Sequence, residues 1–212
     1  MSLAGATLSY RSARKAKGDG HLRRAEILEA AERIFIAEGY EGATIRKIAD
    51  EVGVSSTALY IHFPDKGAIL LEICEAALRK LLVTNSAIAA LPTEPKERMR
   101  LLLDDYMRWG LEHPNAYQLV YSAPRPTGAE SWSPGTAELT AQCYAAFSTI
   151  MTELDAAGRL RQGTVDSAGQ SLWMACHGVV SLLSARPGFP WADRDELMAL
   201  TLDGLLDGLV RD

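Results

Sequence analysis

The chain contains 212 residues, of which 48% are hydrophobic and 23% are charged, and its formal net charge is −5. No apolar run approaches the roughly 20 residues that cross a bilayer, and no apolar signal core follows the N-terminal charges, so we expect a soluble, cytoplasmic protein. Three widely spaced cysteines, Cys74, Cys143 and Cys176, fit neither a disulfide framework nor a metal site, and the sequence predicts buried free thiols.

The positive charge is concentrated at the N-terminus. Residues 1–24 contain six Lys or Arg and one acidic residue, a net charge of +5, whereas residues 25–66 carry −4 and residues 67–212 carry −6. The segment "LSYRSARKAKGDG" has few apolar residues and ends in glycine. We interpret residues 1–21 as a flexible basic arm, with a solvated tail that has no role as the alternative.

Three short helices are predicted in the next segment. Apolar residues at spacings of three and four predict a helix over about 22–38. Thr44 is the expected N-cap of a second helix that ends at Gly53, and Ser55 or Ser56 caps a third. This is a helix-turn-helix arrangement, whose second helix can lie in the DNA major groove. The alternative is a plain helical corner with its polar residues in water.

The third helix has an apolar and a polar face. Ala58, Leu59 and Phe63 are expected to point inward. Hydroxyl, aromatic and imidazole groups point elsewhere, and such groups can donate hydrogen bonds to phosphates or base edges. These side chains are Ser55, Ser56, Thr57, Tyr60 and His62.

The remainder of the chain is predicted to be helical, with short breaks. We expect helices over about 67–90, 96–113, 115–123, 136–157 and 165–185, a proline- and glycine-rich loop over 124–135, and a last helix that starts near Asp193. No repeats and no strand-like alternation occur. The sequence therefore predicts an all-α protein of about nine helices, with a helix-turn-helix domain over 22–66 and a helical domain over 67–212.

The run from Arg23 to Glu75 resembles the N-terminal domain of the tetracycline-repressor (TetR) family of transcription regulators. The shared motifs are "IL-AA--IF---GY", "T---IA---GVS" and "LY-HF-DK". One departure is that Thr57 and Ala58 stand where the family often has glycine or proline followed by a small residue, which bears on the base preference.

The resemblance implies roles for individual residues. Thr44 and Lys66 are expected to contact phosphates, and Ser55, Ser56 and Thr57 to read the groove. Tyr60 and His62 resemble the family's backbone-contacting aromatic and imidazole residues. The alternative for each is an exposed polar side chain, and for Tyr60 half-buried packing.

The segment "LWMACHGVVSLL" contains Trp173, His177 and Gly178, and resembles the subgroup with a Trp-His-Gly (WHG) signature in its C-terminal ligand-binding and dimerisation domain. The resemblance implies a four-helix dimer interface. The alternative is that its residues pack in the subunit's own core. The interface residues that we expect are Ala168, Leu172, Ala175, Val179, Leu183, Gly204 and Gly208.

Aromatic and sulphur-containing side chains predict a pocket for an apolar or aromatic ligand whose identity the sequence does not give. Core packing is the alternative, because such stripes occur in cores as well. We expect His177 to be a hydrogen-bonded packing residue and not a metal ligand, and we expect no cofactor. The candidate pocket residues are Tyr106, Trp109, Tyr117, Tyr121, Phe147, Met151, Trp173 and His177.

These patterns together predict a dimeric repressor that binds a palindromic operator in double-stranded DNA and is released by a small molecule. A ligand-independent regulator or an activator of the same fold is the alternative. An enzyme is disfavoured, because no nucleophile elbow, phosphate loop or dinucleotide fingerprint is present. The adjacent Asp104 and Asp105 point about 100° apart on a helix and cannot face each other as an acid and base pair.

Overall fold

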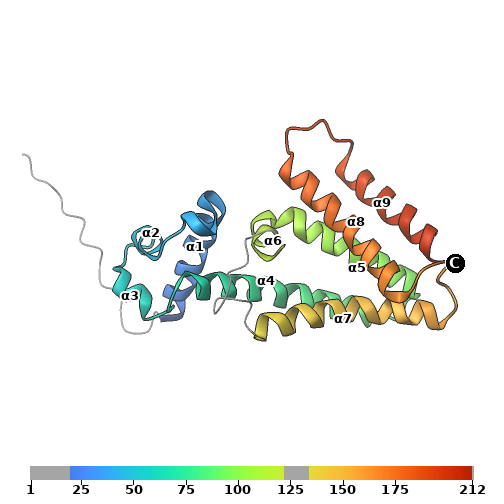
Figure 1. Cartoon of the computed structure of the whole chain (residues 1–212), viewed down its shortest axis with the longest axis horizontal. Coiled ribbons are helices and arrows are strands. Elements are labelled where there is room, and N and C mark those ends of the chain that lie inside the picture. Colours follow the sequence, from blue (N-terminus) through green and yellow to red (C-terminus); the bar gives the residue numbers. More distant parts are fainter. Residues whose placement is uncertain (1–19, 122–133, 212) are drawn as a thin grey trace, which may run out of the picture. The chain divides into compact units, whose positions relative to one another are not determined.

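The computed structural model describes residues 20–121 and 134–211. Within these ranges the chain forms nine α-helices and one isolated antiparallel bridge, between Leu160 and Val210 (Figure 1). The all-α fold class is therefore confirmed. The predicted basic arm over 1–21 and the predicted loop over 124–135 lie mostly outside the described residues. The chain divides into two compact units, Met1–Ile69 and Leu70–Asp212.

Unit 1 contains the three predicted short helices. They are α1 (Gly20–Gly42), α2 (Ile45–Glu51) and α3 (Ser56–Tyr60), followed by the first turn of α4 (Lys66–Ala89). Regular helical geometry in α1 is interrupted at Gly39, where φ is +72°. Only glycine adopts this left-handed backbone cheaply, which is why the predicted end of the first helix falls there.

The core of unit 1 is formed by the apolar face of each helix. Leu59 and Phe63 are buried, as predicted, whereas Ala58 is only partly buried. Between α2 and α3 the chain turns at Gly53, with φ +68°. This turn lets α2 pack against both α1 and α3 over a short length of chain. The fully buried side chains of this core include Ile27, Ala30, Ile48, Ala49 and Leu59.

Unit 2 is a helical bundle that contains the remainder of α4 and five further helices. In it α5 packs against α7, α8 and α9, so α5 is the central helix. Helices α5 to α8 begin and end within about two residues of their predicted positions, and α9 begins next to Asp193, its predicted start. Their bounds are α5 Pro95–Glu112, α6 Pro114–Tyr121, α7 Pro134–Ala156, α8 Val165–Ala185 and α9 Arg194–Leu209.

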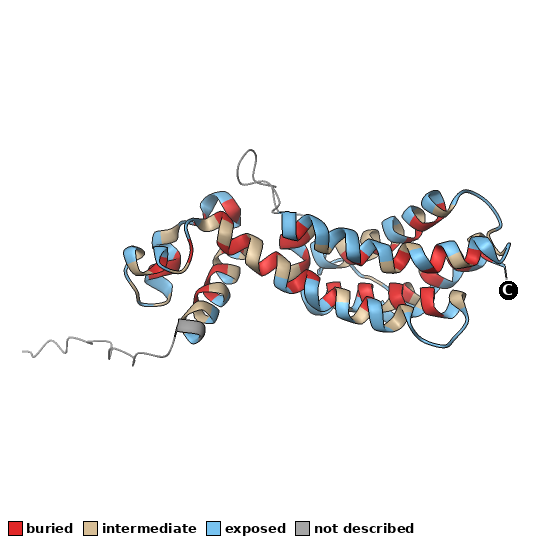
Figure 2. Ribbon diagram, turned by 90° about the horizontal axis from the view of Figure 1, so that it is seen from below, coloured by how far each residue is buried: buried red, intermediate tan, exposed pale blue. Residues whose placement is uncertain are grey.

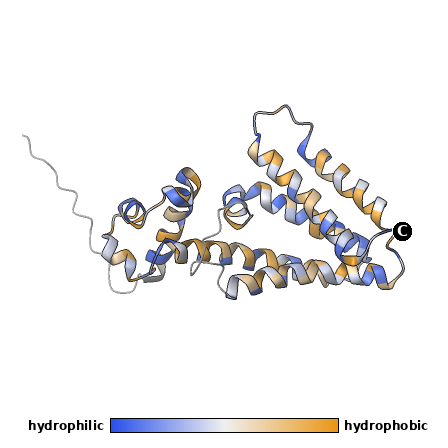
Figure 3. Ribbon diagram, in the orientation of Figure 1, coloured by the Kyte–Doolittle hydropathy of each residue, from blue (hydrophilic) through white to orange (hydrophobic). Residues whose placement is uncertain are grey.

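The helices of unit 2 are amphipathic, and their buried residues face one another (Figures 2 and 3). Two glycines allow close approach. A Cβ atom at Gly110 of α5 would lie 2.7 Å from Val180 Cγ1, and one at Gly169 of α8 would lie 2.9 Å from Phe147 Cε1. Such distances are shorter than normal carbon contacts, so a side chain at either position would force these helices apart.

A buried arginine holds one end of the bundle. Arg98 of α5 is 8% exposed and donates hydrogen bonds to the backbone oxygens of Ala89 (2.7 Å) and Thr93 (3.1 Å). It also forms an ion pair with Glu153 of α7. Because the last carbonyls of a helix have no partner within it, Arg98 satisfies the C-terminus of α4 and links it to α5 and α7.

The three cysteines are free and buried, which confirms the prediction. Burial raises the pKa of the thiol to about 12 for Cys74, to about 11 for Cys143 and to about 12 for Cys176. The thiols are therefore protonated and unreactive near neutral pH. No helix in the described part of the chain is long and apolar enough to span a membrane.

Candidate DNA-binding and ligand-binding sites

The helix-turn-helix of unit 1 is held by two side-chain caps. Thr44 Oγ1 accepts a hydrogen bond from the backbone N–H of Lys47 (3.2 Å) at the start of α2, and Ser55 Oγ accepts one from Ala58 (3.1 Å) at the start of α3. Both hydroxyls serve as N-caps, and each can still donate its own hydrogen. The caps fix the start of α3 and thereby the direction in which its polar face points.

Several predicted DNA-contacting side chains are accessible on unit 1. Thr44, Ser55 and Thr57 are exposed, and Tyr60 is 55% exposed. Since Tyr60 is the last residue of α3 and its ring is open to solvent, half-buried packing is not its role. Ser56 and His62 are partly buried. DNA contact by these residues remains a prediction.

Lys66 joins the first turn of α4 to the segment that follows the kink in α1. Its Nζ donates hydrogen bonds to the backbone oxygens of Tyr40 (2.8 Å) and Ala43 (3.3 Å) and lies 4.2 Å from the centre of the Tyr40 ring. An ammonium group has three N–H donors, of which two bond to these carbonyls, and Glu41 Oε2 lies 4.0 Å from Nζ, so a phosphate would compete with Glu41 for the third. The predicted phosphate contact is compatible with this anchoring, which the sequence did not indicate.

The loop between α3 and α4 is fixed by Arg24 of α1. Its guanidinium donates a hydrogen bond to the backbone oxygen of His62 (2.8 Å) and lies 4.1 Å from the centre of the Phe63 ring. Cation–π contact and hydrogen bond together hold the residues that follow Tyr60. Ile61, which was not predicted as a contact, is 81% exposed beside Tyr60 and offers an apolar contact at the same surface.

Unit 2 contains a cavity of about 680 Å³. This volume lies within the roughly 300–1,000 Å³ of small-molecule sites. Side chains from α4, α5, α6, α7 and α8 form its wall, and most of them are apolar or aromatic. The lining residues are Leu78, Leu81, Asn85, Leu102, Leu103, Tyr106, Val120, Tyr121, Ala137, Thr140, Ala141, Cys143, Tyr144, Phe147 and Trp173.

Four of the eight predicted pocket residues line this cavity, namely Tyr106, Tyr121, Phe147 and Trp173. Met151 does not line it, and this prediction is corrected. Its side chain is fully buried, with Cγ 3.5 Å from the position that a Cβ atom at Gly169 would occupy, so it fills the contact between α7 and α8. Small or aliphatic lining residues such as Ala137 and Leu81 were missed because they look like ordinary core.

The other predicted pocket residues form a polar cluster behind the cavity wall. The hydroxyl of Tyr117 forms a hydrogen bond with His177 Nδ1, which lies 3.2 Å from the hydroxyl of Tyr106. Trp109 packs its ring against Tyr117, with centroids 6.3 Å apart. None of these three residues lines the cavity. Tyr117 and His177 contact the lining residue Tyr121, and Trp109 contacts Tyr117.

Burial keeps this cluster uncharged. It lowers the pKa of His177 below its ordinary value of 6.5 and raises the pKa of the Tyr106, Tyr117 and Tyr121 hydroxyls. A neutral His177 can accept a hydrogen bond at Nδ1 from the Tyr117 hydroxyl or donate one to it, according to its tautomer. This agrees with the expectation that His177 is a hydrogen-bonded packing residue.

Lowering the pH from about 7.5 to about 5.5 is expected to destabilise the native protein more than a His177→Gln variant. Because the folded-state pKa of His177 lies below 6.5, the unfolded chain binds the proton first as the pH falls. The loss begins near the unfolded pKa and grows until the pH passes the folded pKa. Urea unfolding of both proteins at both pH values measures this difference, and equal losses would contradict it.

The predicted dimer interface needs correction at two positions. Ala168 and Leu172 are 2% and 0% exposed within the single chain, so they belong to the subunit's own core. Ala175, Val179 and Leu183 are partly buried. At Gly204 and Gly208 of α9 an added Cβ atom would meet nothing within 4 Å, so both glycines face open space.

A different set of apolar residues is exposed on the last two helices. Met174 and Leu182 of α8 are 63% and 55% exposed, and Leu200 of α9 is 65% exposed. Met174, Gly178 and Leu182 follow one another at intervals of four, as do Leu200, Gly204 and Gly208, so each set forms one helix face. We call these six residues the α8–α9 stripe.

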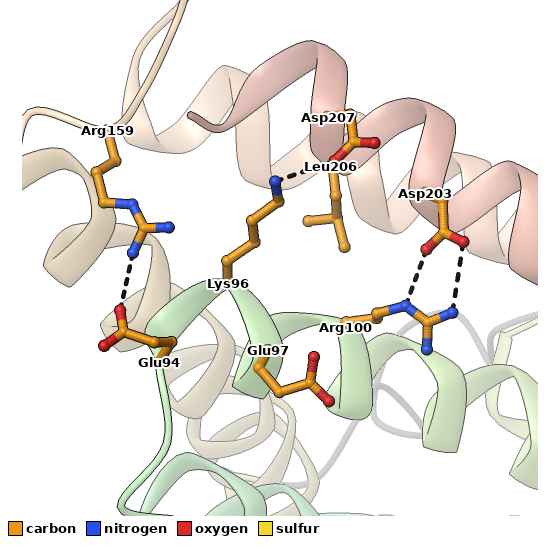
Figure 4. Close-up of a pocket in the computed structure, with 8 residues that line it drawn as sticks. All are labelled: Glu94, Lys96, Glu97, Arg100, Arg159, Asp203, Leu206 and Asp207. Atoms are coloured by element: carbon orange, nitrogen blue, oxygen red, sulfur yellow. Dashed lines mark hydrogen bonds and ion pairs between the residues drawn. The ribbon is translucent and has the colours of Figure 1, made fainter. Parts of the chain in front are cut away.

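A second hollow in unit 2 is lined mostly by charged side chains, six of which form ion pairs with one another. Arg159 contacts Glu94 (3.0 Å), Lys96 contacts Asp207 (3.0 Å) and Arg100 contacts Asp203 (2.8 Å), as Figure 4 shows. These pairs connect the start of α5 to α9 and to the residues before α8. Their charges are directed at each other, which makes this a structural contact and a poor site for a ligand.

Among the described residues, no group of three or more His, Cys, Asp or Glu side chains is placed to hold a metal ion. The chain combines a capped helix-turn-helix in one unit with an apolar cavity in a helical bundle in the other. A helix-turn-helix together with an apolar cavity is the arrangement expected of a DNA-binding regulator.

Comparison with known families identifies the chain. Residues 27–73 match the family described as bacterial regulatory proteins, tetR family, and residues 99–205 match a tetracyclin repressor-like C-terminal domain. The protein belongs to the TetR family of bacterial transcriptional regulators. The resemblance noted from the helix-turn-helix motifs is thereby confirmed, and the protein is a DNA-binding regulator and not an enzyme.

Curated relatives support the same class. The chain is 27% identical over 170 residues to the HTH-type transcriptional repressor AcnR of Corynebacterium jeikeium, covering 78% of this chain and 84% of that protein. It is 32% identical over 104 residues to the repressor KstR2 of Mycobacterium tuberculosis, covering 49% and 52%. With AcnR of Corynebacterium diphtheriae the identity is 48%, but the match spans only 24% of this chain and 27% of that protein.

Solved structures share the whole fold. PfmR, a TetR family regulator of Thermus thermophilus, is 27% identical with a TM-score of 0.69, covering 87% of this chain and 99% of that chain. FadR of Bacillus subtilis, solved with stearoyl-CoA, is 20% identical with a TM-score of 0.69, covering 88% and 97%. The similarity to FadR shows a shared fold alone, because the sequence identity is low.

Proposed function

We propose that the protein is a homodimeric repressor that binds a palindromic operator and is released from it by a small apolar molecule bound in the cavity of unit 2. The observation that carries this proposal is the presence in one chain of a capped, exposed α3 and a cavity of about 680 Å³. Because AcnR and KstR2 are named as transcriptional repressors, they support repression over activation as the proposed effect on transcription. A protein that represses bacterial genes binds DNA in the cytoplasm, so the proposed location of this protein is the cytoplasm.

In this proposal Ser55, Ser56 and Thr57 read the major groove, and Tyr60 and His62 contact the DNA backbone beside them. Thr44 and Lys66 meet phosphates. One α3 of five residues reads only a few base pairs. Two copies related by a twofold axis would read half-sites about 34–36 Å apart.

The dimer is proposed to form through the α8–α9 stripe. Gly178, Gly204 and Gly208 carry no side chain, so two helices can approach closely there. Met174, Leu182 and Leu200 are exposed in the single chain, and their side chains would be removed from water on either side of this contact. A surface of this kind can meet itself across a twofold axis. Of the residues predicted from sequence, Ala175, Val179, Leu183, Gly204 and Gly208 remain available to it.

Helix α4 offers a route from ligand to DNA. It runs without interruption from Lys66 to Ala89, and it contributes Leu78, Leu81 and Asn85 to the cavity wall. A ligand that displaces this wall would move the turn that Lys66 anchors to Tyr40 and Ala43. The two α3 helices would then no longer match the spacing of the half-sites.

Selection of bound duplexes from a random DNA library tests the proposal. The native protein is expected to enrich a palindrome at near-physiological salt, and Tyr60→Ala to weaken binding to that palindrome by about 10-fold or more, because each dimer loses two contacts. Val83→Ala is the control for general damage, because Val83 is 71% exposed in unit 2 and lies outside the cavity wall. Enrichment of a single half-site without symmetry would contradict the dimeric arrangement.

A further inference from the structure

We propose that the cavity of unit 2 takes an elongated, uncharged molecule with a hydroxyl or amide N–H at the end that meets Asn85, and rejects the ionised acid of the same chain length. This inference rests on the proposed function in treating the cavity as the effector site. It concerns binding, which can be measured without DNA.

The shape of the cavity sets the shape of the ligand. On α7 the wall extends from Ala137 to Phe147, which at 1.5 Å per residue is a length of about 15 Å. On α4 it runs from Leu78 through Leu81 to Asn85. Leucine, alanine and aromatic side chains occupy most of this length, so the long part of the ligand is apolar.

The charge of the wall sets the charge of the ligand. None of the described residues that line the cavity is Lys, Arg, His, Asp or Glu. Cys143, with a pKa raised to about 11, and the buried tyrosines are protonated at neutral pH. His177, behind Tyr106, is kept neutral by burial. An ionised carboxylate in this wall would lose its hydration without gaining a cation, which is strongly unfavourable.

Asn85 indicates where the polar end of the ligand would lie. This residue is 5% exposed and lines the cavity, yet its Oδ1 has no hydrogen-bond partner. A buried carboxamide oxygen without a donor is costly, and a ligand O–H or N–H would satisfy it. Asn85 is the last cavity-lining residue along α4, so the head group of an elongated ligand would lie at that end.

The Tyr106 hydroxyl is a weaker candidate for the polar contact. It already lies within hydrogen-bonding distance of His177 Nδ1 (3.2 Å) and of the Tyr117 hydroxyl (3.5 Å). A ligand group there would compete with an existing cluster, whereas a group at Asn85 would meet an empty acceptor. The assignment therefore favours Asn85 as the residue that selects the head group.

Three probes of one chain length test the inference: 1-decanol, decyl methyl ether and sodium decanoate. Binding to the full chain is followed by the change in total tryptophan fluorescence, to which Trp173 in the cavity wall contributes, and by the thermal midpoint. Decanol is expected to bind about 3- to 10-fold more tightly than the ether, which has no donor. At pH 8, decanoate is expected to bind at least about 100-fold more weakly than decanol.

An Asn85→Leu variant removes the acceptor at similar volume. It is expected to fold at least as stably as the native chain, since an unsatisfied polar group is lost, and to bind decanol and the ether equally. Thr84→Leu, one position earlier on α4 and outside the cavity wall, is the matched control and should keep the native preference. Equal binding of decanol and ether by the native protein would overturn the role of Asn85.

Decanoate binding as tightly as decanol would overturn the uncharged ligand class, and this comparison needs no variant. The proposed function fails separately. If decanol binds as expected but leaves the selected operator bound at saturating concentration, the ligand class is upheld and the repressor-release mechanism is wrong. If decanoate binds more tightly and releases the operator, the mechanism is upheld and the ligand class is wrong.

Discussion

Leu172→Ala is expected to lower the free energy of unfolding by about 2–5 kcal/mol, one of the largest effects of a single truncation in this chain. Leu172 is fully buried on the inner face of α8, beside Gly169, where α7 and α8 approach closely. The truncation would leave a void that the close-packed neighbours cannot fill. Urea unfolding at several protein concentrations measures the effect.

The matched change on the outer face of the same helix is Met174→Glu. Met174 is 63% exposed and belongs to the α8–α9 stripe, so the variant is expected to keep the stability of the folded monomer within about 0.5 kcal/mol. In the proposed dimer two glutamates would meet across the twofold axis, weakening association by about 100-fold or more. Sedimentation velocity measures the fraction of dimer in each variant. It should fall for Met174→Glu, on the outer face of α8, and not for folded Leu172→Ala, on the inner face. A Leu172→Ala protein that is stable but monomeric would restore Leu172 to the interface.

Arg98→Met is expected to destabilise unit 2 by about 2–4 kcal/mol. Arg98 is 8% exposed, and its loss would leave the backbone oxygens of Ala89 and Thr93 without this donor. Breaking a largely buried pair by removing one partner costs about 3–5 kcal/mol when both ions are buried. The lower figure applies here because the Glu153 side chain is 41% exposed and can be hydrated.

Arg100→Met is the control for this prediction. It lies two residues further along α5, and its ion pair with Asp203 has side chains 38% and 51% exposed. Exposed pairs contribute about 0–1 kcal/mol, so the control should change stability little. High salt should reduce the effect of Arg100→Met further and leave that of Arg98→Met largely intact. If Arg98→Met and Arg100→Met lower the free energy of unfolding by similar amounts, burial does not explain the contribution of Arg98 to stability.

The helices could be predicted because each carries local signals. Thr44 and Ser55 precede short apolar runs as N-caps, and both side chains accept the expected hydrogen bonds. The first two helices were predicted to end at about residue 38 and at Gly53, and both Gly39 and Gly53 have positive φ. Caps and left-handed glycines act over three or four residues, which is the range that a sequence pattern can report.

The candidate ligand site could be predicted only in part. Tyr106, Tyr121, Phe147 and Trp173 were expected there as large aromatics and do line the cavity. Asn85 was not expected, because an asparagine in a helix is ordinarily a solvent-exposed residue. Its significance comes from 5% exposure and an oxygen without a partner, and neither property can be read from sequence spacing.

The family could be predicted from the helix-turn-helix motifs, and the all-α class from local periodicity, caps and turn glycines, because all of these signals lie within short stretches of chain. Which side of α8 belongs to the core depends on tertiary packing. Leu172 and Met174 are both apolar and two residues apart, yet one is 0% and the other 63% exposed. An apolar residue is compatible with a core, a cavity wall or a subunit interface, and its environment is chosen by the helices that pack against it.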